Sequence, residues 1–203
     1  MKIIVVTENR KEGNNQANGT LNIKCPVVMM KADSSLLKDN KPLFVPDFTS
    51  RLTGGFHLVV RISRLGKSIP KRFAHRYYDG ITVGLDVRAD DIAEQLSRAG
   101  QPWDLAESFD GGTVIGSFIP TDGSPLGKMK ATLHSKDGTS LCYETETWLW
   151  SVDELIEQTS RIFQLRQGDL LFCGPAATRV PLKIGGHIEA AIGNRCLLDF
   201  NVR

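Results

Sequence analysis

The sequence predicts an α+β domain in which strands predominate and the helices are few and short. Small or polar residues alternate with apolar ones from Gly55 to Ile62, and an Asp-Gly turn at 137–138 joins two alternating runs at 128–135 and 139–145. A period of two is typical of a strand, and Asp-Gly between two such runs predicts a hairpin. Only three segments have helical patterns. Many strands with few helices favour an irregular, predominantly β domain of the α+β class.

Length and composition are those of an ordinary globular chain. The 203 residues are 41% hydrophobic and 24% charged, with a formal net charge of +2. This length suits one domain, or one domain with a small N-terminal attachment. We expect an N-terminal strand and mobile loop over residues 1–24 and the main domain over residues 25–203. The small net charge indicates neither a nucleic-acid nor a membrane partner.

The N-terminus and the cysteines indicate the cellular compartment of the protein. The apolar run within residues 1–6 is too short for a signal peptide or a membrane span. We predict that it forms the first strand, followed by a mobile loop at 11–20, which is polar and rich in Gly and Asn. The four cysteines lie far apart, and no CxxC or Cys/His spacing indicates zinc. Free, buried thiols are typical of a reducing compartment, so we expect a cytoplasmic protein.

Further strands are predicted where short apolar or alternating runs lie between turn residues. They are expected at residues 25–30, 55–62, 81–87, 128–135, 139–145, 170–173, 187–192 and 196–202. In the strand at 55–62, one face carries Phe56 and Leu58, and the more polar face presents Gly55 and His57 together. The alternation predicts that this strand is half-buried.

Three helices are predicted from start and stop signals. The first begins at Pro70 and ends at Gly80. The second uses Asp91 as its N-cap, with Glu94 three residues later, and ends at Gly100. The third begins with a capping box over residues 151–154, Ser-Val-Asp-Glu.

Several segments form an ordered set along the chain: Lys31 after the apolar run 27–30, the stretch 80–91 containing Leu-Asp-Val, the stretch 100–110 containing Gly-Gln-Pro-Trp and Ser-Phe-Asp, Gly-Asp at 168–169, and residues 181–189. In this order and with these gaps, they resemble the catalytic domain of the fumarylacetoacetate hydrolase family. The similarity runs from about Cys25 to the C-terminus.

This resemblance implies a fold and a chemistry. The family fold is a mixed β-roll or β-sandwich, commonly a homodimer. Its enzymes hydrolyse a carbon–carbon bond, decarboxylate, or isomerise small 2-oxo and 2,4-dioxo acids. They use Mg²⁺ or Mn²⁺, held by a Glu-x-Glu pair on one strand and an Asp on another. Such ions prefer several hard oxygen ligands, and they polarise the oxygens of the substrate.

The sequence departs from the family at the metal-binding positions. The Glu-x-Glu pair aligns with Gly55-Phe56-His57, so the first carboxylate is absent and the second is an imidazole. Asp86 matches the family aspartate. One carboxylate and one imidazole make a poor Mg²⁺ site and suit a softer ion, provided that other ligands complete the set.

The substrate-binding positions depart as well. The family lysine before Ser-Phe is Glu107, and the family arginine after Asp86 is Asp90. Glu107 inverts the charge where the carboxylate of an oxo acid would lie. At about 4 Å and an effective dielectric near 20, a like-charge contact costs about 4 kcal/mol before screening. The family turn Thr-Gly-Thr-Pro is Phe-Cys-Gly-Pro at 172–175, and the N-terminal loop offers only Glu8 and Glu12, without a histidine.

His57 and Asp86 are the candidate ligands of a divalent metal, Mg²⁺ or Mn²⁺ by family. The alternative for His57 is a histidine on the polar face with a local hydrogen bond. The alternative for Asp86 is a strand-end or turn aspartate.

Glu107 and Cys173 are the candidate catalytic residues of a remodelled site. Glu107 would be a general base, and its alternative is a surface or ion-paired glutamate. Cys173 would be a nucleophile in place of a hydroxyl, and its alternative is a small buried hydrophobic residue.

Lys31, Ser108 and Phe109 are the candidate substrate-binding residues, because they match family positions. For Lys31, a solvated lysine at a strand end is the alternative.

These residues lead to three hypotheses about the function of the chain. The chain is a family enzyme with an altered site, acting on a small organic acid with a divalent metal at His57 and Asp86. Alternatively, it is a catalytically inactive relative that acts as a ligand-binding or scaffolding homodimer. A third hypothesis is metal-free chemistry that uses Cys173 or Glu107.

Overall fold

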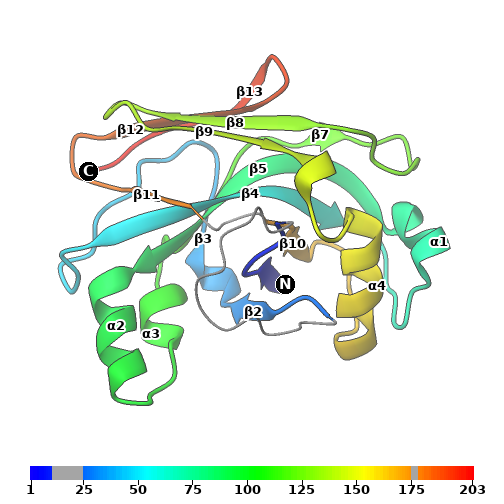
Figure 1. The fold of residues 1–203 in the computed structure, drawn as a ribbon, viewed down its shortest axis with the longest axis horizontal. Coiled ribbons are helices and arrows are strands. Elements are labelled where there is room, and N and C mark those ends of the chain that lie inside the picture. Colours follow the sequence, from blue (N-terminus) through cyan, green and yellow to red (C-terminus); the bar gives the residue numbers. More distant parts are fainter. Residues whose placement is uncertain (11–24, 175–177) are drawn as a thin grey trace.

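The computed structural model describes residues 1–10, 25–174 and 178–203, and in them strands predominate over a few short helices, as the sequence predicts. Two β-sheets form the body of the molecule (Figure 1). The predicted mobile loop at 11–20 lies outside the described residues.

The larger sheet has nine strands in the described chain, with the order β2-β1-β10-β4-β5-β6-β3; β11 also pairs with β4, and β7 with β5. The strands are β1 (Ile3–Val6), β2 (Val28–Lys31), β3 (Leu36–Leu37), β4 (Leu52–Ile62), β5 (Tyr78–Ala89), β6 (Thr113–Ile115), β7 (Ile119–Pro120), β10 (Leu170–Phe172) and β11 (Arg179–Pro181). The first strand thus lies inside this sheet, parallel to β10 and antiparallel to β2.

A second sheet of four strands lies across one face of the first, above β4 and β5 in Figure 1. Its order is β13-β12-β8-β9, formed by β8 (Lys130–Ser135), β9 (Ser140–Glu144), β12 (His187–Ile192) and β13 (Arg195–Asn201). The predicted hairpin joins β8 to β9, and Gly138 adopts the positive φ of +91° that its turn requires.

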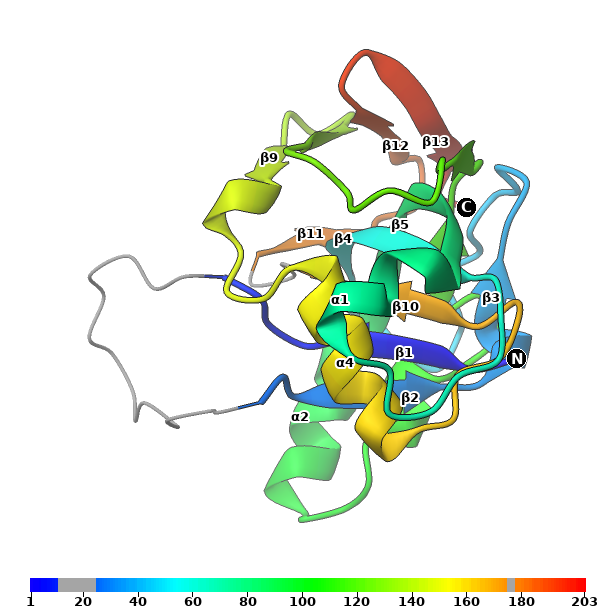
Figure 2. The same cartoon turned by 90° about the vertical axis from the view of Figure 1, so that its right-hand side faces the viewer.

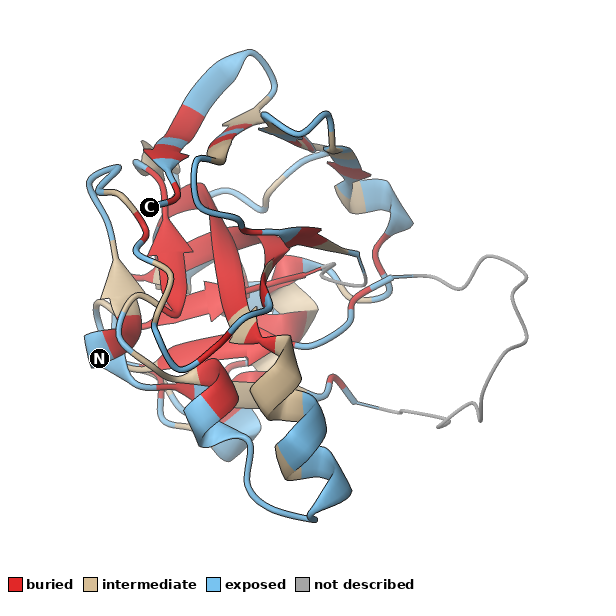
Figure 3. Ribbon diagram, turned by 90° about the vertical axis from the view of Figure 1, so that its left-hand side faces the viewer, coloured by how far each residue is buried: buried red, intermediate tan, exposed pale blue. Residues whose placement is uncertain are grey.

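The strand β4 is buried on both faces, so the prediction of a half-buried strand is wrong. Phe56 packs between the two sheets with Leu133 and Phe200, while Val59 on the other face packs with Phe172. The sheet curls around β4, and other elements therefore cover the side that alternation assigns to solvent. In Figure 3 the buried residues gather on the strands of the larger sheet, while exposed residues lie on loops, on helices and on parts of the smaller sheet.

The helices differ from prediction at their ends. The helix predicted to end at Gly80 is one turn, α1 (Lys71–Ala74), followed by a 3₁₀ turn; β5 then starts at Tyr78, because the sheet extends further than the local sequence indicates. The helix α2 (Asp90–Arg98) begins two residues earlier than predicted, with Ala89 rather than Asp91 at its N-cap. Asp91 does not cap it, because its carboxylate accepts hydrogen bonds from the Thr49 hydroxyl and the Ser50 backbone.

The helix α4 (Val152–Ile162) has the predicted capping box, in which Ser151 and Glu154 bond reciprocally. Figure 2 shows α4 beside α1, and the ammonium of Lys71 bonds the carboxylate of Glu154 across them at 2.9 Å. A further helix, α3 (Asp104–Glu107), was not predicted, because four residues are too few to show a helical period. Every helix among the described residues is too short or too polar to cross a lipid bilayer.

Candidate functional site

Asp86 is at the centre of a buried ionic cluster on the larger sheet. The side chain lies on β5 and is almost fully buried. One carboxylate oxygen accepts from the ammonium of Lys31 at 2.6 Å, and the other accepts from Nη1 of Arg179 at 2.9 Å. Burial alone would raise the pKa of Asp86, but the charges of Lys31 and Arg179 outweigh it and hold the pKa at about 2. The group is therefore ionised at neutral pH.

Lys31 ends β2 and is 2% exposed, so the alternative of a solvated lysine is wrong. Its ammonium donates to Asp86 at 2.6 Å, to the carbonyl of Val87 at 2.9 Å and to the carbonyl of Gly112 at 2.6 Å. An ammonium has three protons to donate. All three are used within the protein, which makes Lys31 a structural support for Asp86 in this geometry.

Arg179, on β11, is a site residue that sequence reasoning did not identify. Its Nε donates to the hydroxyl of Thr53 at 2.9 Å, and its Nη2 donates to the backbone carbonyls of Thr53 at 3.3 Å and Asp86 at 2.5 Å. No motif in the sequence points to it. Only the register of β11, which places Arg179 opposite Gly55 on β4, brings it to the cluster.

His57 is fully buried on β4, two residues from Gly55. Its Nδ1 accepts a hydrogen bond from the backbone N–H of Gly174 at 3.0 Å. Burial lowers the pKa of His57 to about 4, so the ring is neutral at pH 7. With Nδ1 as an acceptor, the single proton is on Nε2, which has no hydrogen-bond partner in the described part of the chain. This arrangement corresponds to the histidine with a local hydrogen bond.

The residues of this cluster do not fit Mg²⁺ or Mn²⁺. Such ions need several unshared carboxylate or carbonyl oxygens. Both oxygens of Asp86 are already paired with cations, Gly55 supplies no ligand, and the proton on Nε2 of His57 makes it a donor rather than a ligand. The geometry therefore does not favour the predicted metal site at His57 and Asp86.

A second group of potential metal ligands lies elsewhere. His187 and Glu189 on β12 and Asp199 on β13 have ligand atoms within 4.8 Å of one another. They lie on the exposed face of the smaller sheet, away from Asp86. His187 and Glu189 fall inside a segment that resembles the family, but nothing in the sequence singles them out as ligands.

Glu107, the last residue of α3, is 7% exposed, so the alternative of a surface glutamate is wrong, while that of an ion-paired glutamate agrees with its contact to Arg88. Its Oε2 has no hydrogen-bond partner, and its Oε1 lies 3.8 Å from Nε of Arg88, which is itself paired with Asp90 at 2.5 Å. Burial, and then the charge of Asp86, raise the pKa of Glu107 to about 7. Two hollows of about 430 and 370 Å³ flank Trp103, and Glu107 lines both.

Ser108 and Phe109 follow Glu107 and have structural contacts. The hydroxyl of Ser108 accepts from the backbone N–H of Ala32 at 2.6 Å, and thus ties α3 to the segment after Lys31. Phe109 packs edge-on against Phe48 at 5.4 Å between ring centroids. Both residues position α3 beside the cluster.

Cys173 is fully buried, as expected of a small hydrophobic residue. Its thiol donates to the carbonyl of Leu171 at 3.5 Å, and burial raises the pKa of the thiol. A thiol that burial keeps neutral is a poor nucleophile. The geometry therefore gives no support to a catalytic role for Cys173.

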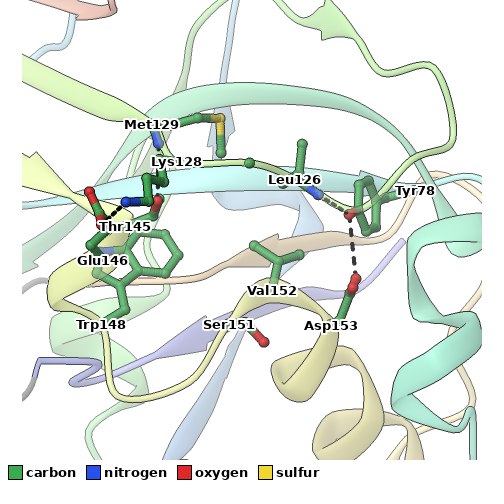
Figure 4. Close-up of a pocket in the computed structure, with 11 residues that line it drawn as sticks. Tyr78, Leu126, Lys128, Met129, Thr145, Glu146, Trp148, Ser151, Val152 and Asp153 are labelled. Atoms are coloured by element: carbon green, nitrogen blue, oxygen red, sulfur yellow. Dashed lines mark hydrogen bonds and ion pairs between the residues drawn. The ribbon is translucent and has the colours of Figure 1, made fainter.

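A separate cavity of about 320 Å³ lies between the start of α4 and the loop before β8 (Figure 4). Tyr78 faces Asp153 across it, with the phenol oxygen 3.4 Å from the carboxylate, and the Leu126 backbone N–H donates to the same phenol at 3.3 Å. None of the site residues predicted from the sequence lines this cavity.

Comparisons with known proteins agree on one family. Residues 2–202 match the model of the fumarylacetoacetate (FAA) hydrolase C-terminal domain. The mitochondrial oxaloacetate tautomerase of Caenorhabditis elegans is 30% identical over 205 residues, which cover 100% of this chain and 94% of that protein. The human mitochondrial oxaloacetate tautomerase is 27% identical over 178 residues, which cover 87% of this chain and 80% of that protein.

Solved structures have the same fold. The fumarylpyruvate hydrolase of Pseudomonas aeruginosa, crystallised with Mn²⁺ and pyruvate, aligns with a TM-score of 0.87 at 24% identity, over 100% of this chain and 89% of that one. The 5-carboxymethyl-2-hydroxymuconate delta-isomerase of Mycobacterium smegmatis aligns with a TM-score of 0.84 at 24% identity, over 99% and 78% of the two chains. The β-roll architecture implied by the family resemblance is thereby confirmed.

Proposed function

Because the chain belongs to the fumarylacetoacetate hydrolase family, we propose that it catalyses the keto–enol isomerisation of a small oxo acid, with Glu107 as the proton-transferring group. One observation carries the proposal. Glu107 is a buried carboxyl group with a pKa of about 7 and an unpartnered oxygen, and it lines two hollows of the surface.

Isomerisation needs little more than proton transfer. The carboxylate of Glu107 would take a proton from the carbon next to the keto group, and the Glu107 carboxyl would then give this proton to the enolate oxygen, either directly or through a water molecule. One C–H bond breaks, one O–H bond forms, and nothing is oxidised or reduced. A general acid–base group works best when its pKa is near the working pH. The names of the tautomerase relatives support the same reaction class.

Charge supports the binding of an anionic substrate here. The sequence suggests that a negative Glu107 would repel a carboxylate by about 4 kcal/mol. With a pKa of about 7, however, Glu107 is protonated in a large fraction of molecules at neutral pH. Arg88 lies 3.8 Å from Glu107 and is shared with Asp90, so one guanidinium partly offsets the negative charge beside Glu107.

The test is an assay of oxaloacetate tautomerisation, followed by the ultraviolet absorbance of the enol. We expect activity that persists in EDTA and falls at least about a hundredfold in Glu107→Gln, the lower range for loss of a general acid–base group. Glu189→Gln, on the far sheet, should retain full activity. Activity that vanishes with EDTA, or that is equal in Glu107→Gln and wild type, would contradict the proposal.

A second candidate is a catalytically inactive homodimer that binds a small organic acid. Exposed aromatic and aliphatic side chains favour it: Phe44, Phe48 and Ile184 are 65%, 50% and 75% exposed. Exposed apolar side chains mark an association surface where they form a contiguous patch, and a dimer interface that includes these three would bury them. A dimer by light scattering, stabilised by pyruvate but without turnover of oxaloacetate, would favour this candidate over the isomerase.

A further inference from the structure

The Arg179 side chain reaches Asp86 by crossing a strand that has no side chain in its way. Arg179, Gly55 and Asp86 lie opposite one another in register on the neighbouring strands β11, β4 and β5. Residues in such a row project to the same face of a sheet. Because Gly55 has no side chain, the guanidinium of Arg179 extends over β4 and bonds the carboxylate and the carbonyl of Asp86. A glutamate at position 55, as the family has, would occupy this path.

The contact between Arg179 and Asp86 contributes to the charge balance of the buried cluster. A buried carboxylate is costly unless a cation pairs with it. In the family a divalent ion is that cation, and here Lys31 and Arg179 bring two positive charges to the one negative charge of Asp86. We infer that Arg179, made possible by Gly55, is an internal cation that takes the place of the divalent metal ion of the family.

Arg179 also has donor capacity left for a ligand. A guanidinium has five N–H groups. The Nε group and both Nη2 groups are used by Thr53 and Asp86, and one of the two Nη1 groups is used by Asp86. Within residues 1–10, 25–174 and 178–203, one Nη1–H therefore has no acceptor, on a side chain that is 14% exposed. This second step rests on the proposed function: the remaining N–H would bind one oxygen of the oxo acid by a charged hydrogen bond.

Manganese binding tests the first step without reference to activity. Electron paramagnetic resonance of wild-type protein titrated with Mn²⁺ at micromolar concentrations should show free ion only. The triple variant Gly55→Glu, His57→Glu, Arg179→Met restores three carboxylates and should bind one Mn²⁺ per chain. The matched variant with Gln at positions 55 and 57 and Met at 179 should bind none.

Wild-type protein alone can overturn this step, even where the triple variant does not fold. One tightly bound Mn²⁺ per wild-type chain, lost in Asp86→Asn, would show that Arg179 does not replace the ion. A folded triple variant that binds no Mn²⁺ would also count against the inference, because the restored carboxylates should then suffice.

Pyruvate binding in EDTA, measured by calorimetry, tests the second step. Arg179→Lys should weaken binding at least about tenfold, since a hydrogen bond to a charged group contributes that much. Arg195→Met, an exposed arginine on β13, should bind as wild type does. Equal affinity in Arg179→Lys, or no pyruvate binding by wild type, would overturn the second step. Pyruvate binding through Arg179 without tautomerase activity would overturn the proposed function and leave the inference intact.

Discussion

The backbone N–H of Gly174 donates to Nδ1 of His57 at 3.0 Å, and this bond fixes the tautomer of a fully buried ring. The ring also packs edge-on against Phe172, with 5.6 Å between centroids. A proton on Nδ1 would break the bond from Gly174 and place a charge in a dry environment. For this reason the protonation of His57 is coupled to the stability of the fold.

We predict that His57 destabilises the protein in acid. Burial lowers the pKa of His57 from 6.5 to about 4. The unfolded chain therefore binds more protons between these values, and the stability that His57 contributes is complete above pH 6.5 and is lost as the pH falls to 4. The loss is about 3 kcal/mol. In His57→Asn, whose amide oxygen can still accept from Gly174, urea unfolding should not show this loss, whereas the exposed His134→Asn should behave as wild type.

The titration of Glu107 should change the stability of the fold in the opposite direction to that of His57, over nearly the same pH range. Burial and the charge of Asp86 raise its pKa from 4.5 to about 7. The folded chain then binds more protons, so the stability that Glu107 contributes is present below pH 4.5 and is lost as the pH rises through 7, by about 3 kcal/mol.

The two effects oppose each other, so wild-type stability should be nearly flat between pH 4.5 and 6.5, the range the two titrations share. In Glu107→Gln, the free energy of unfolding should fall only toward acid pH, because His57 still titrates. In His57→Asn, it should fall only toward neutral pH, because Glu107 still titrates. Urea midpoints at four pH values would separate these slopes. Parallel slopes in the two variants would contradict the assignment.

Local signals in the sequence were sufficient for much of the fold. The capping box at Ser151 and the Asp-Gly turn at 137–138 involve only neighbouring residues, and both are present as predicted. The local predictions that were wrong concern residues whose contacts lie in distant segments of the chain. Asp91 is a good N-cap by type, yet Thr49 and Ser50 use its carboxylate. No local pattern contains that information.

The candidate site was foreseen only where a family position was retained or replaced. The departures at Gly55, His57 and Glu107 were visible in the sequence, and Asp86 was recognised as the retained carboxylate. Arg179 was not, because its contact depends on the pairing of β11 with β4. The environment of Glu107 was also hidden, since burial cannot be read from a four-residue helix.

Lys31→Met should strongly destabilise the protein without changing the overall fold. The substitution removes one of the two cations on Asp86 and leaves the carbonyls of Val87 and Gly112 without their donor. Breaking a buried ion pair costs about 3–5 kcal/mol. The matched control is Lys128→Met, which removes an ion pair with Glu146 at the surface and should give an unfolding midpoint indistinguishable from wild type. Similar midpoints for the two variants would mean that Lys31 is not a structural support.

Gly84→Ala tests how closely the strands beside the cluster approach one another. Gly84 lies opposite His57 on β4, and a Cβ atom there would be 2.7 Å from the backbone carbonyl of Val114 and 2.9 Å from the ring of Phe172. A backbone oxygen within a sheet cannot move aside easily, so we expect a loss of about 1–3 kcal/mol from overpacking, with a lower thermal midpoint. Gly127→Ala is the matched control, because a Cβ atom at that position has open space around it. A stable Gly84→Ala variant with an unchanged midpoint would require β5 and β6 to separate, and a shift in the backbone resonances of Val114 would reveal that movement.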